Sequence, residues 1–445
     1  MDPSQINWLA AVDAARAIRD GAISSEELVA ACLASVRDTD DAVQAWAFLD
    51  PDHALAQARM LDLARKEGKP LGPLHGVPVG VKDIIDTTDM PTEDGTVLHA
   101  GRIPDGDATV VASLRAAGAI VLGKTVTTEL ATYAPGKTCN PHNPEHTPGG
   151  SSSGSAAAVA AGMVPLAIGT QTNGSVIRPA AYCGVYGFKP THGLIPRTGI
   201  LRQSRTLDQV GVFARTIEDA ALACEQLVGF DERDPDTRPR ARMPFVRVAE
   251  EAPPLPPLLA FVKGSVWDQT EEETRGAFDE LVEHLGDRVE EITLPENTRD
   301  ALDWHRTIME AEMAANYAAE YEKGRDRLSE SLRGQLERGR EISALEYQAA
   351  LARIPRLIDG FGQLFDRYDA ILTPAAAGTA PRGLQSTGSP VFCTLWTLCG
   401  MPAISLPLMR GANGLPMGVQ LVGPRYGDAR LLRTARWLAA GVAGD

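Results

Sequence analysis

The chain has 445 residues, 44% of them hydrophobic, and a formal charge of −15 at pH 7. This length can bury a large core, and the acidic balance excludes the basic footprint that nucleic acids or anionic membranes attract. The start of the chain lacks a basic segment followed by an apolar one, and Gly162 and Pro165 interrupt the longest apolar stretch, residues 156–168. We therefore expect a cytoplasmic protein without a membrane span.

Cysteine usage favours a reducing compartment. The six cysteines are scattered along the sequence without Cys-x-x-Cys pairs, in a chain too long to need disulfide stapling. We interpret them as buried free thiols.

The N-terminal half of the sequence alternates between helical and strand patterns. Ser24-Ser25-Glu26-Glu27 resembles a helix start ahead of residues 28–36, and residues 51–66 are rich in alanine and charge. Short β-branched runs separated by glycine and proline then predict strands at residues 77–81, 120–122 and 164–168. This alternation favours an α/β fold.

The C-terminal half contains a helical stretch between two regions of core-like sequence. Residues 231–257 are charged and rich in proline, which predicts a connection over the surface. Amphipathic helices are predicted at 270–285, 299–323 and 343–368, and strands at 370–374, 403–406 and 418–422. We expect one domain, 1–445, made of an N-terminal helical segment (1–70), a core (71–230), a mostly helical insertion (231–368) and a C-terminal part of the core (369–445).

Two serine-bearing glycine turns and one lysine carry most of the chemical information. The turns are Gly-Gly-Ser-Ser-Ser-Gly-Ser at 149–155 and Thr-Asn-Gly-Ser at 172–175, and Lys82 lies in the apolar run 77–83. Two hydroxyls and one amine can supply a nucleophile, a proton relay and a base without histidine. Such a lysine must be partly neutral near pH 7, and burial among Val79 and Val81 would lower its pKa.

Three other uses of these residues fit less well. The 149–155 turn lacks the Gly-Lys-Ser/Thr ending of a phosphate-binding P-loop. Gly-x-Ser-x-Gly at 150–154 would make Ser152 the nucleophile of an α/β-hydrolase elbow, but the proline-rich residues 140–148 before it predict a loop instead of a strand. No serine is followed by lysine at the third position, so a Ser-x-x-Lys pair is absent from the sequence.

The remaining arrangement makes Ser175 the nucleophile, Ser151 the relay and Lys82 the base. The 172–175 turn would supply backbone N–H donors for the oxyanion of a tetrahedral intermediate. Gly174 would let the substrate carbonyl approach the turn closely.

These residues are arranged in a way that resembles the amidase signature family, and within it a subgroup that malonamidase represents. Residues 73–83 resemble the lysine segment of the family, 148–158 its glycine and serine block, and 169–175, 179–184 and 187–191 its nucleophile segment. The resemblance resumes at 398–403 and 415–421. It implies a mixed β-sheet of about eleven strands sandwiched between α-helices, with no cofactor and no metal.

The resemblance also implies a role for each matching residue. Ser175 attacks the carbonyl, Ser151, which follows a cis peptide bond in the family, passes the proton, and Lys82 accepts it. The backbone N–H groups of Thr172, Asn173, Gly174 and Ser175 would form the oxyanion hole. Three positions depart from the common family pattern: Gln171, Ser153 and Asn173.

Substrate-binding residues are predicted beside these groups. Arg178, one helical turn from Ser175, would hold a substrate carboxylate bidentately, or it would form an ion pair with an acid such as Asp208. Tyr133 and Gly150 are expected to line the pocket. His142, His146 and His192 are expected to have loop or surface roles.

The predicted activity is hydrolysis of the C–N bond of a small amide through an acyl-enzyme. The candidate substrates include carbamates (urethanes) and small acidic amides such as malonamate. An alternative is an amidotransferase subunit that releases ammonia from glutamine for partner subunits. We expect a small-molecule substrate, no direct nucleic-acid or membrane contact, and a homodimer.

Overall fold

The computed structural model describes residues 3–241 and 243–443 of the chain, so both ends of the predicted 1–445 span lie outside the described residues. Within them, strands β1 to β11 form one mixed sheet in the order β1-β3-β2-β4-β6-β5-β10-β11-β9-β7-β8. The predicted sheet of about eleven strands in an α/β fold is confirmed. The strands are β1 (Trp46–Leu49), β2 (Pro78–Lys82), β3 (Ile120–Thr125), β4 (Leu166–Gln171), β5 (Tyr186–Lys189), β6 (Gln209–Ala214), β7 (Leu259–Val262), β8 (Val289–Ile292), β9 (Ala370–Pro374), β10 (Ala403–Arg410) and β11 (Pro416–Val422).

Strand direction changes along the sheet. β3, β2 and β4 are parallel neighbours, as are β9, β7 and β8, while the strands from β4 through β6, β5, β10 and β11 to β9 pair antiparallel. Parallel neighbours end at the same edge of a sheet. The carboxyl ends of β2 and β4 therefore lie side by side.

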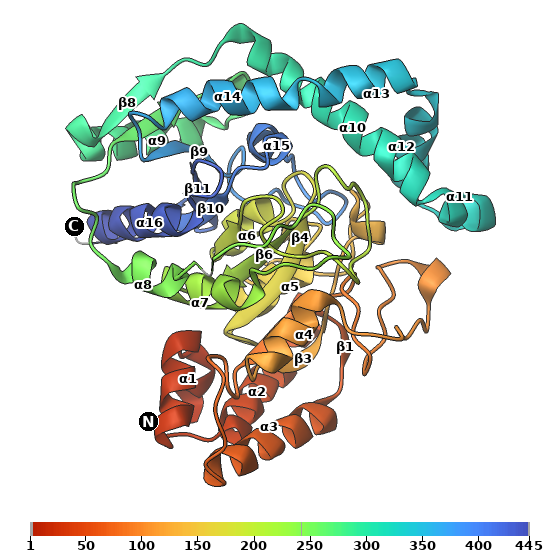
Figure 1. The fold of residues 1–445 in the computed structure, drawn as a ribbon, viewed down its shortest axis with the longest axis vertical. Helices are drawn as coiled ribbons and strands as arrows, with labels where there is room; N and C mark the ends of the chain where they lie inside the picture. Colours follow the sequence, from red (N-terminus) through yellow and green to blue (C-terminus); the bar gives the residue numbers. More distant parts are fainter. Residues whose placement is uncertain (1–2, 242, 444–445) are drawn as a thin grey trace.

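Helices cover both faces of the sheet, as Figure 1 shows. Leu166 and Ile168 of β4 belong to one hydrophobic cluster, whereas Ala167 between them belongs to another. This period of two is what a strand buried on both faces requires. One face packs against α4 (Thr109–Ala116), α7 (Ile217–Leu227), α8 (Phe245–Glu250), α9 (Glu272–Leu285) and α16 (Asp428–Ala443).

The opposite face carries the remaining layers. Its helices are α2 (Ser25–Val43), α3 (Pro51–Lys66), α5 (Ser153–Ala160), α6 (Ile177–Cys183), α10 (Ala301–Asn316), α12 (Glu330–Glu341), α13 (Ala344–Leu351), α14 (Ile354–Leu364) and α15 (Val391–Leu398). α1 (Ala11–Asp20) contributes to clusters on both sides of the sheet. Figure 1 shows α10 to α14 as one layer above the sheet.

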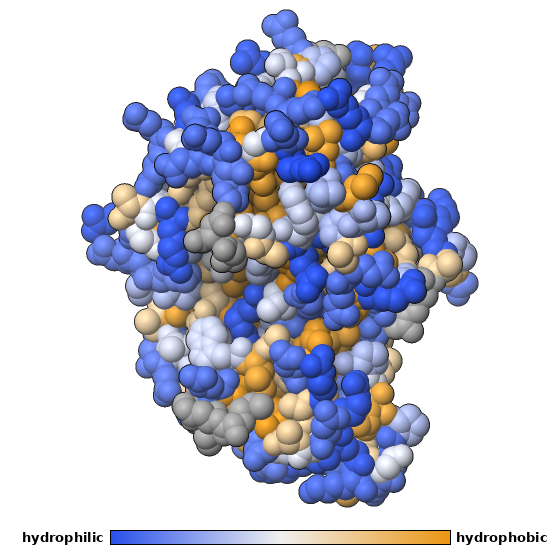
Figure 2. Space-filling model, turned by 90° about the vertical axis from the view of Figure 1, so that its left-hand side faces the viewer, coloured by the Kyte–Doolittle hydropathy of each residue, from blue (hydrophilic) through white to orange (hydrophobic). Residues whose placement is uncertain are grey.

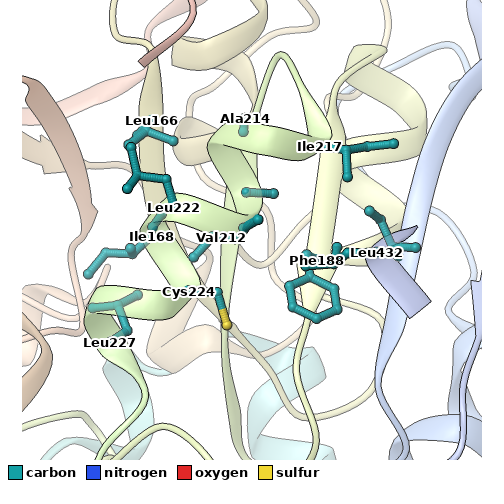
Figure 3. Close-up of a cluster of buried hydrophobic side chains, with 14 of the residues drawn as sticks. Leu166, Ile168, Phe188, Val212, Ala214, Ile217, Leu222, Cys224, Leu227 and Leu432 are labelled. Atoms are coloured by element: carbon teal, nitrogen blue, oxygen red, sulfur yellow. The ribbon is translucent and has the colours of Figure 1, made fainter. Parts of the chain in front are cut away.

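The packing of α7 illustrates how the first face is built. Figure 3 shows its side chains lying across β4, β6 and β5. The labelled residues are Ile217, Leu222, Cys224 and Leu227 on the helix, Leu166, Ile168, Val212, Ala214 and Phe188 on the strands, and Leu432 on α16. Cys224 is a free thiol there, and the other cysteines are also buried and free.

The N-terminal helices follow the sequence pattern closely. α3 has the predicted bounds, and its N-terminus is capped by Asp50, which accepts a hydrogen bond from His53 N. α2 begins after Ser24, whose side chain forms a capping box with Glu27. Capping of this kind satisfies backbone donors that the first helical turn leaves unpaired.

The predicted helical insertion, 231–368, contains β7 and β8 of the central sheet, and its helices are more divided than the sequence pattern predicts. The predicted helix 299–323 is broken at Tyr317 into α10 and α11 (Ala318–Gly324), and 343–368 is broken before Pro355 into α13 and α14. α12 was not predicted. Its sequence is strongly polar, with buried positions at Leu332, Gln335, Leu336 and Gly339, so only a narrow apolar stripe marks the helix.

The predicted surface connection at 231–257 is also partly wrong, because α8 lies within it. Phe245 is fully buried in the cluster that contains α7 and α16. A short helix with one anchoring aromatic gives little periodic signal.

Within residues 3–241 and 243–443, none of the helices has the length and apolarity needed to cross a membrane. Figure 2 shows one face of the molecule, where hydrophilic side chains predominate and hydrophobic residues form separate patches.

The approach of α5 to the sheet generates a prediction about Gly154. A Cβ there would lie 2.2 Å from Ala45 O and 2.4 Å from Val126 N, both rigid backbone atoms. We expect Gly154→Ala to lower the free energy of unfolding by about 2 kcal/mol, as overpacking does, measured by urea denaturation. Gly360→Ala in α14 is the control, because a Cβ there meets nothing within 4 Å. It should be neutral or stabilising by up to about 1 kcal/mol, and equal losses in both variants would contradict the packing argument.

Candidate active site

Lys82 is the last residue of β2 and lies at the shared edge of the parallel strands. Its Nζ is 2.7 Å from Ser151 Oγ and 2.9 Å from Thr170 Oγ1 on β4. The lysine side chain is fully buried. The topology thus brings together the predicted base and the predicted relay, which are far apart in the sequence.

Burial determines the protonation of this lysine. Desolvation lowers the pKa of Lys82 from 10.5 to about 7, and the carboxylate of Asp208 acts in the opposite direction. Burial likewise raises the pKa of Asp208 to about 6. A lysine with this pKa is substantially neutral near pH 7, and its lone pair can then accept a proton.

The glycine and serine block 149–155 divides into a reactive position and a scaffold. The Gly150–Ser151 peptide is cis, and Ser151 Oγ faces Lys82. Ser152 Oγ instead lies 3.2 Å from Thr170 O and accepts from Thr170 N, and its side chain is fully buried. Ser153 and Ser155 donate to the carbonyls of Val126 and Ile168. Ser152 therefore holds the start of α5 against β4. The α/β-hydrolase elbow requires a strand directly before its serine, and among the described residues no strand lies directly before Ser152.

The turn from Thr172 to Ser175 connects β4 to α6 and is closed by Gln171. Gln171 Oε1 accepts from Val176 N and Ile177 N at 2.8 and 3.0 Å, and its Nε2 donates to Thr397 Oγ1. An aspartate could make the first two contacts but could not donate the third. The amide at this position therefore ties the turn to α15.

The backbone of the turn has donors free for a ligand. Among the described residues, none accepts a hydrogen bond from the backbone N–H of Asn173, Gly174 or Ser175. Each of these N–H groups shares its peptide with a carbonyl that does have a partner. Thr172 O accepts from His305 Nε2, Asn173 O from Thr397 Oγ1, and Gly174 O from Arg178 N. Buried backbone donors without partners are rare, and a cluster of them suits a developing oxyanion.

Asn173 is held on both sides of its amide. Its Nδ2 donates to Tyr133 Oη at 3.0 Å, and its Oδ1 accepts from Thr394 Oγ1 at 2.7 Å. The departure from the common family pattern therefore adds contacts to α15 and to the 129–134 segment. Gly174 is required for packing, since a Cβ there would lie 2.9 Å from Pro390 Cβ.

Arg178 is buried without an acidic partner among the described residues. Its guanidinium donates to Gly150 O at 2.6 Å, to Gly388 O at 2.8 Å and to Thr387 Oγ1 at 3.1 Å, and its Nε has no partner. The ion pair with Asp208 that the sequence left open is not formed. Asp208 instead accepts from Thr172 Oγ1 and from the backbone of Gln203 and Ser204.

Two cavities flank the turn. One, of about 400 Å³, is lined by Thr170, Thr172 and Asp208. The other, of about 720 Å³, is lined by Tyr133, Asn173 and His305 with residues of α10, α12 and α15. The predicted pocket residue Tyr133 thus borders the larger cavity, between the turn and the helical insertion.

The predicted residues are not all joined by hydrogen bonds. Ser151 and Lys82 are in contact, whereas Ser175 Oγ has no hydrogen-bond partner among the described residues; its side chain is 7% exposed. Such contacts are often long without substrate. Four further residues that contact Lys82 or the turn were not predicted from the sequence: Thr170, Thr394, Thr397 and His305. Thr170 lies within the matched nucleophile segment, but nothing in the pattern of the other three indicates that they reach the turn.

Three comparisons with known proteins agree on the family. A family model described as Amidase matches residues 27–432. A glutamyl-tRNA(Gln) amidotransferase subunit from Symbiobacterium thermophilum is 35% identical over 456 residues, covering 93% of each chain. The peptide amidase of Stenotrophomonas maltophilia is 28% identical with a TM-score of 0.84, covering 96% of each chain.

A further solved structure is similar over nearly its whole length. It comes from a vestigial protein complex described as revealing the evolutionary origins of an s-triazine catabolic enzyme. Its chain is 27% identical with a TM-score of 0.90, and the match covers 97% of this chain and 98% of that one.

The Lys82 environment predicts a specific titration. In protein labelled with ¹³C at the lysine ε-carbons, the Lys82 signal, assigned by its loss in Lys82→Arg, should titrate with a midpoint near pH 7. Asp208→Asn should lower that midpoint, because the carboxylate raises the pKa of Lys82. Lys189 is the internal control: burial also lowers its pKa to about 7, but its neighbouring acid is Asp428. An unchanged or raised Lys82 midpoint in Asp208→Asn would contradict the assignment.

Proposed function

This chain belongs to the amidase signature family of C–N hydrolases, and we propose that it hydrolyses a small amide through an acyl-enzyme on Ser175. The observation that carries the proposal is the buried Lys82, whose pKa is lowered to about 7 and whose Nζ lies 2.7 Å from Ser151 Oγ. The unpaired N–H donors of the 173–175 backbone lie in the turn that carries Ser175. A base, a relay and an oxyanion site are the components that acyl transfer requires.

The acylation half begins with proton transfer. Ser175 Oγ gives its proton to Ser151 Oγ while Ser151 passes its own proton to the neutral amine of Lys82. The Ser175 oxygen forms a bond to the substrate carbonyl carbon, and the carbonyl oxygen takes the negative charge. Collapse of this intermediate breaks the C–N bond, and the leaving nitrogen takes the proton from Lys82 through Ser151.

The second half regenerates the enzyme. Water gives a proton through Ser151 to Lys82, and its oxygen attacks the acyl carbon. The bond to Ser175 Oγ then breaks, and the proton returns to the serine. In both halves the negative oxygen would accept from the N–H groups of Asn173, Gly174 and Ser175, of which each typically contributes about 3 kcal/mol.

Substrate class depends on the groups beside Ser175. Arg178 is buried, lacks an acidic partner among the described residues and has a free Nε, so we propose that it favours a small acidic amide such as malonamate. Neutral amides and carbamates remain candidates, because a carbamate presents the same carbonyl to Ser175. Tyr133 and Gly150 would also contact the substrate, since Tyr133 Oη accepts from Asn173 of the turn and Gly150 O accepts from Arg178.

A second candidate function is favoured by the sequence comparison. The similarity to a glutamyl-tRNA(Gln) amidotransferase component covers 93% of both chains, so this chain would release ammonia from glutamine for partner subunits. The two candidates differ in whether the chain acts alone. We propose that it acts on its own, as a homodimer, on a small molecule.

Covalent labelling tests the nucleophile. Intact-mass analysis should detect one fluorophosphonate adduct on the wild-type chain, none on Ser175→Ala, and an undiminished adduct on Ser152→Ala. Hydrolysis by Ser175→Ala should fall at least about 1,000-fold, as loss of a nucleophile does. Ser152→Ala is the matched control, because its hydroxyl contacts the Thr170 backbone. Wild-type hydrolysis by Ser175→Ala would overturn the mechanism.

A substrate screen tests the class of amide. Ammonia or amine release from malonamate, neutral amides, anilides, carbamates and glutamine is measured with the purified chain alone. We expect the highest kcat/KM on malonamate and a selective loss of about 100-fold on acidic substrates in Arg178→Ala, as loss of a charge-assisted hydrogen bond predicts. Equal losses on neutral and acidic amides would assign Arg178 to structure, and activity on glutamine that requires a partner would favour the amidotransferase.

A further inference from the structure

The helical insertion contributes a histidine to the active-site turn. His305 lies on α10, is 1% exposed, and its Nε2 is 2.9 Å from Thr172 O. A carbonyl oxygen can only accept, so Nε2 must carry the hydrogen. Burial lowers the pKa of His305 to about 4, which keeps the ring neutral at higher pH.

This hydrogen bond controls the direction of a backbone N–H. Thr172 O and Asn173 N belong to one peptide group, and the cis bond of the described residues lies elsewhere, at Gly150–Ser151. In a planar trans peptide the C=O and the N–H point in opposite directions. By holding Thr172 O on the side of α10, His305 therefore turns the N–H of Asn173 toward the opposite side.

The neighbouring peptides of the turn are held by other elements. Thr397 on α15 holds Asn173 O at 2.6 Å, and the backbone of α6 holds Gly174 O through Arg178 N at 3.0 Å. Only the Thr172–Asn173 peptide, among these described groups, is held by the helical insertion. Rotation of this peptide would remove its N–H from the cluster without disturbing the others.

α10 also reaches Thr172 by a second route. Thr172 Oγ1 donates to Asp208 Oδ1 at 2.6 Å, and Asp208 Oδ2 accepts from Gln203 N at 2.9 Å. Gln203 O in turn accepts from Asn316 Nδ2 at 3.0 Å. Asn316 lies at the end of α10, about three turns beyond His305. The main chain and the side chain of Thr172 are thus both tied to the same helix, which fixes the angle at which the turn leaves β4.

We propose that His305 is a positioning residue for the oxyanion hole, which holds the Thr172–Asn173 peptide so that Asn173 N–H faces the developing oxyanion. This inference rests on the proposed function. It assigns to the helical insertion a part in catalysis as well as in shaping the larger cavity. The ring nitrogen that faces the turn already carries its hydrogen, so His305 is not a base for Ser175.

The test compares variants that keep or remove the donor. In His305→Gln the side-chain amide can place an N–H near the position of Nε2, whereas His305→Leu and His305→Met fill the site without a donor. We expect kcat to fall about 100-fold in both apolar variants, as when one oxyanion donor is lost, with KM within about twofold of wild type. His305→Gln should retain kcat within about fivefold, since its N–H restores the contact.

A matched control separates positioning from general destabilisation. His75 is also buried, and its Nε2 faces Leu61 O at 3.1 Å, away from the turn. We expect His75→Leu to lower the unfolding midpoint while kcat at a temperature where the protein is folded stays at the wild-type value. The binding of a boronic acid, which forms a tetrahedral adduct on the serine, should weaken in the apolar His305 variants in proportion to kcat/KM.

Each result has a defined meaning. Wild-type kcat in a folded His305→Leu or His305→Met would overturn the positioning role, as would equal losses in His305→Gln and the apolar variants. If kcat of the wild type falls at low pH and this fall is absent in His305→Gln, the histidine has an acid-base role, and the positioning role is overturned as well. Failure of the proposed function is a separate result, since it requires hydrolysis to persist in Ser175→Ala.

Discussion

The burial of Lys82 is the constraint on which the rest of the site depends. Burial disfavours an ammonium group that lacks a close carboxylate, and the pKa of Lys82 is therefore lowered to about 7. To bury Lys82 in this place, the strand that carries it must be covered on both faces of the sheet, and a neighbouring parallel strand must end at the same edge. The α/β sheet supplies both, with Thr170 of β4 and Ser151 at the start of α5 accepting the two hydrogen bonds.

The turn that carries Ser175 is ordered in a different way. It has no regular secondary structure, and its shape comes from contacts with Gln171 at the end of the preceding strand and with three residues that are distant in the sequence. These are Thr394 and Thr397 from α15 and His305 from α10. Gln171 accepts from the N–H groups of Val176 and Ile177, and the other contacts satisfy a carbonyl or a side chain. Among the described residues, none accepts from the N–H groups of Asn173, Gly174 or Ser175. A loop constrained from several directions needs little reorganisation when charge develops, which is the physical content of preorganisation.

The sequence predicted the local features of this protein better than its distant contacts. The strand at 370–374 coincides with β9 because a short apolar run bounded by charge and proline has one plausible length. The segments that carry Lys82, Ser151 and Ser175 were recognisable because the residues within each are contiguous. His305 was not, since a histidine on an amphipathic helix has many ordinary roles and its partner lies 133 positions away. Which of Ser151 to Ser153 faces Lys82 depends on the backbone path, and it was the resemblance of the 148–158 block that predicted Ser151, whose Oγ lies 2.7 Å from Lys82 Nζ.

The electrostatics of the site support the proposed preference for an acidic substrate. Arg178 and Lys82 are both fully buried, and Arg178 donates to neutral oxygens alone among its described contacts. A buried guanidinium that lacks a carboxylate is under-compensated, because neutral acceptors offset less of its desolvation than an anion would. An anionic group bound beside Arg178 would offset the desolvation of the guanidinium, whereas a cationic group there would add unfavourable repulsion. The same excess of positive potential favours an oxyanion over a neutral carbonyl, so the proposed substrate preference and the proposed stabilisation of the oxyanion would have a common electrostatic origin.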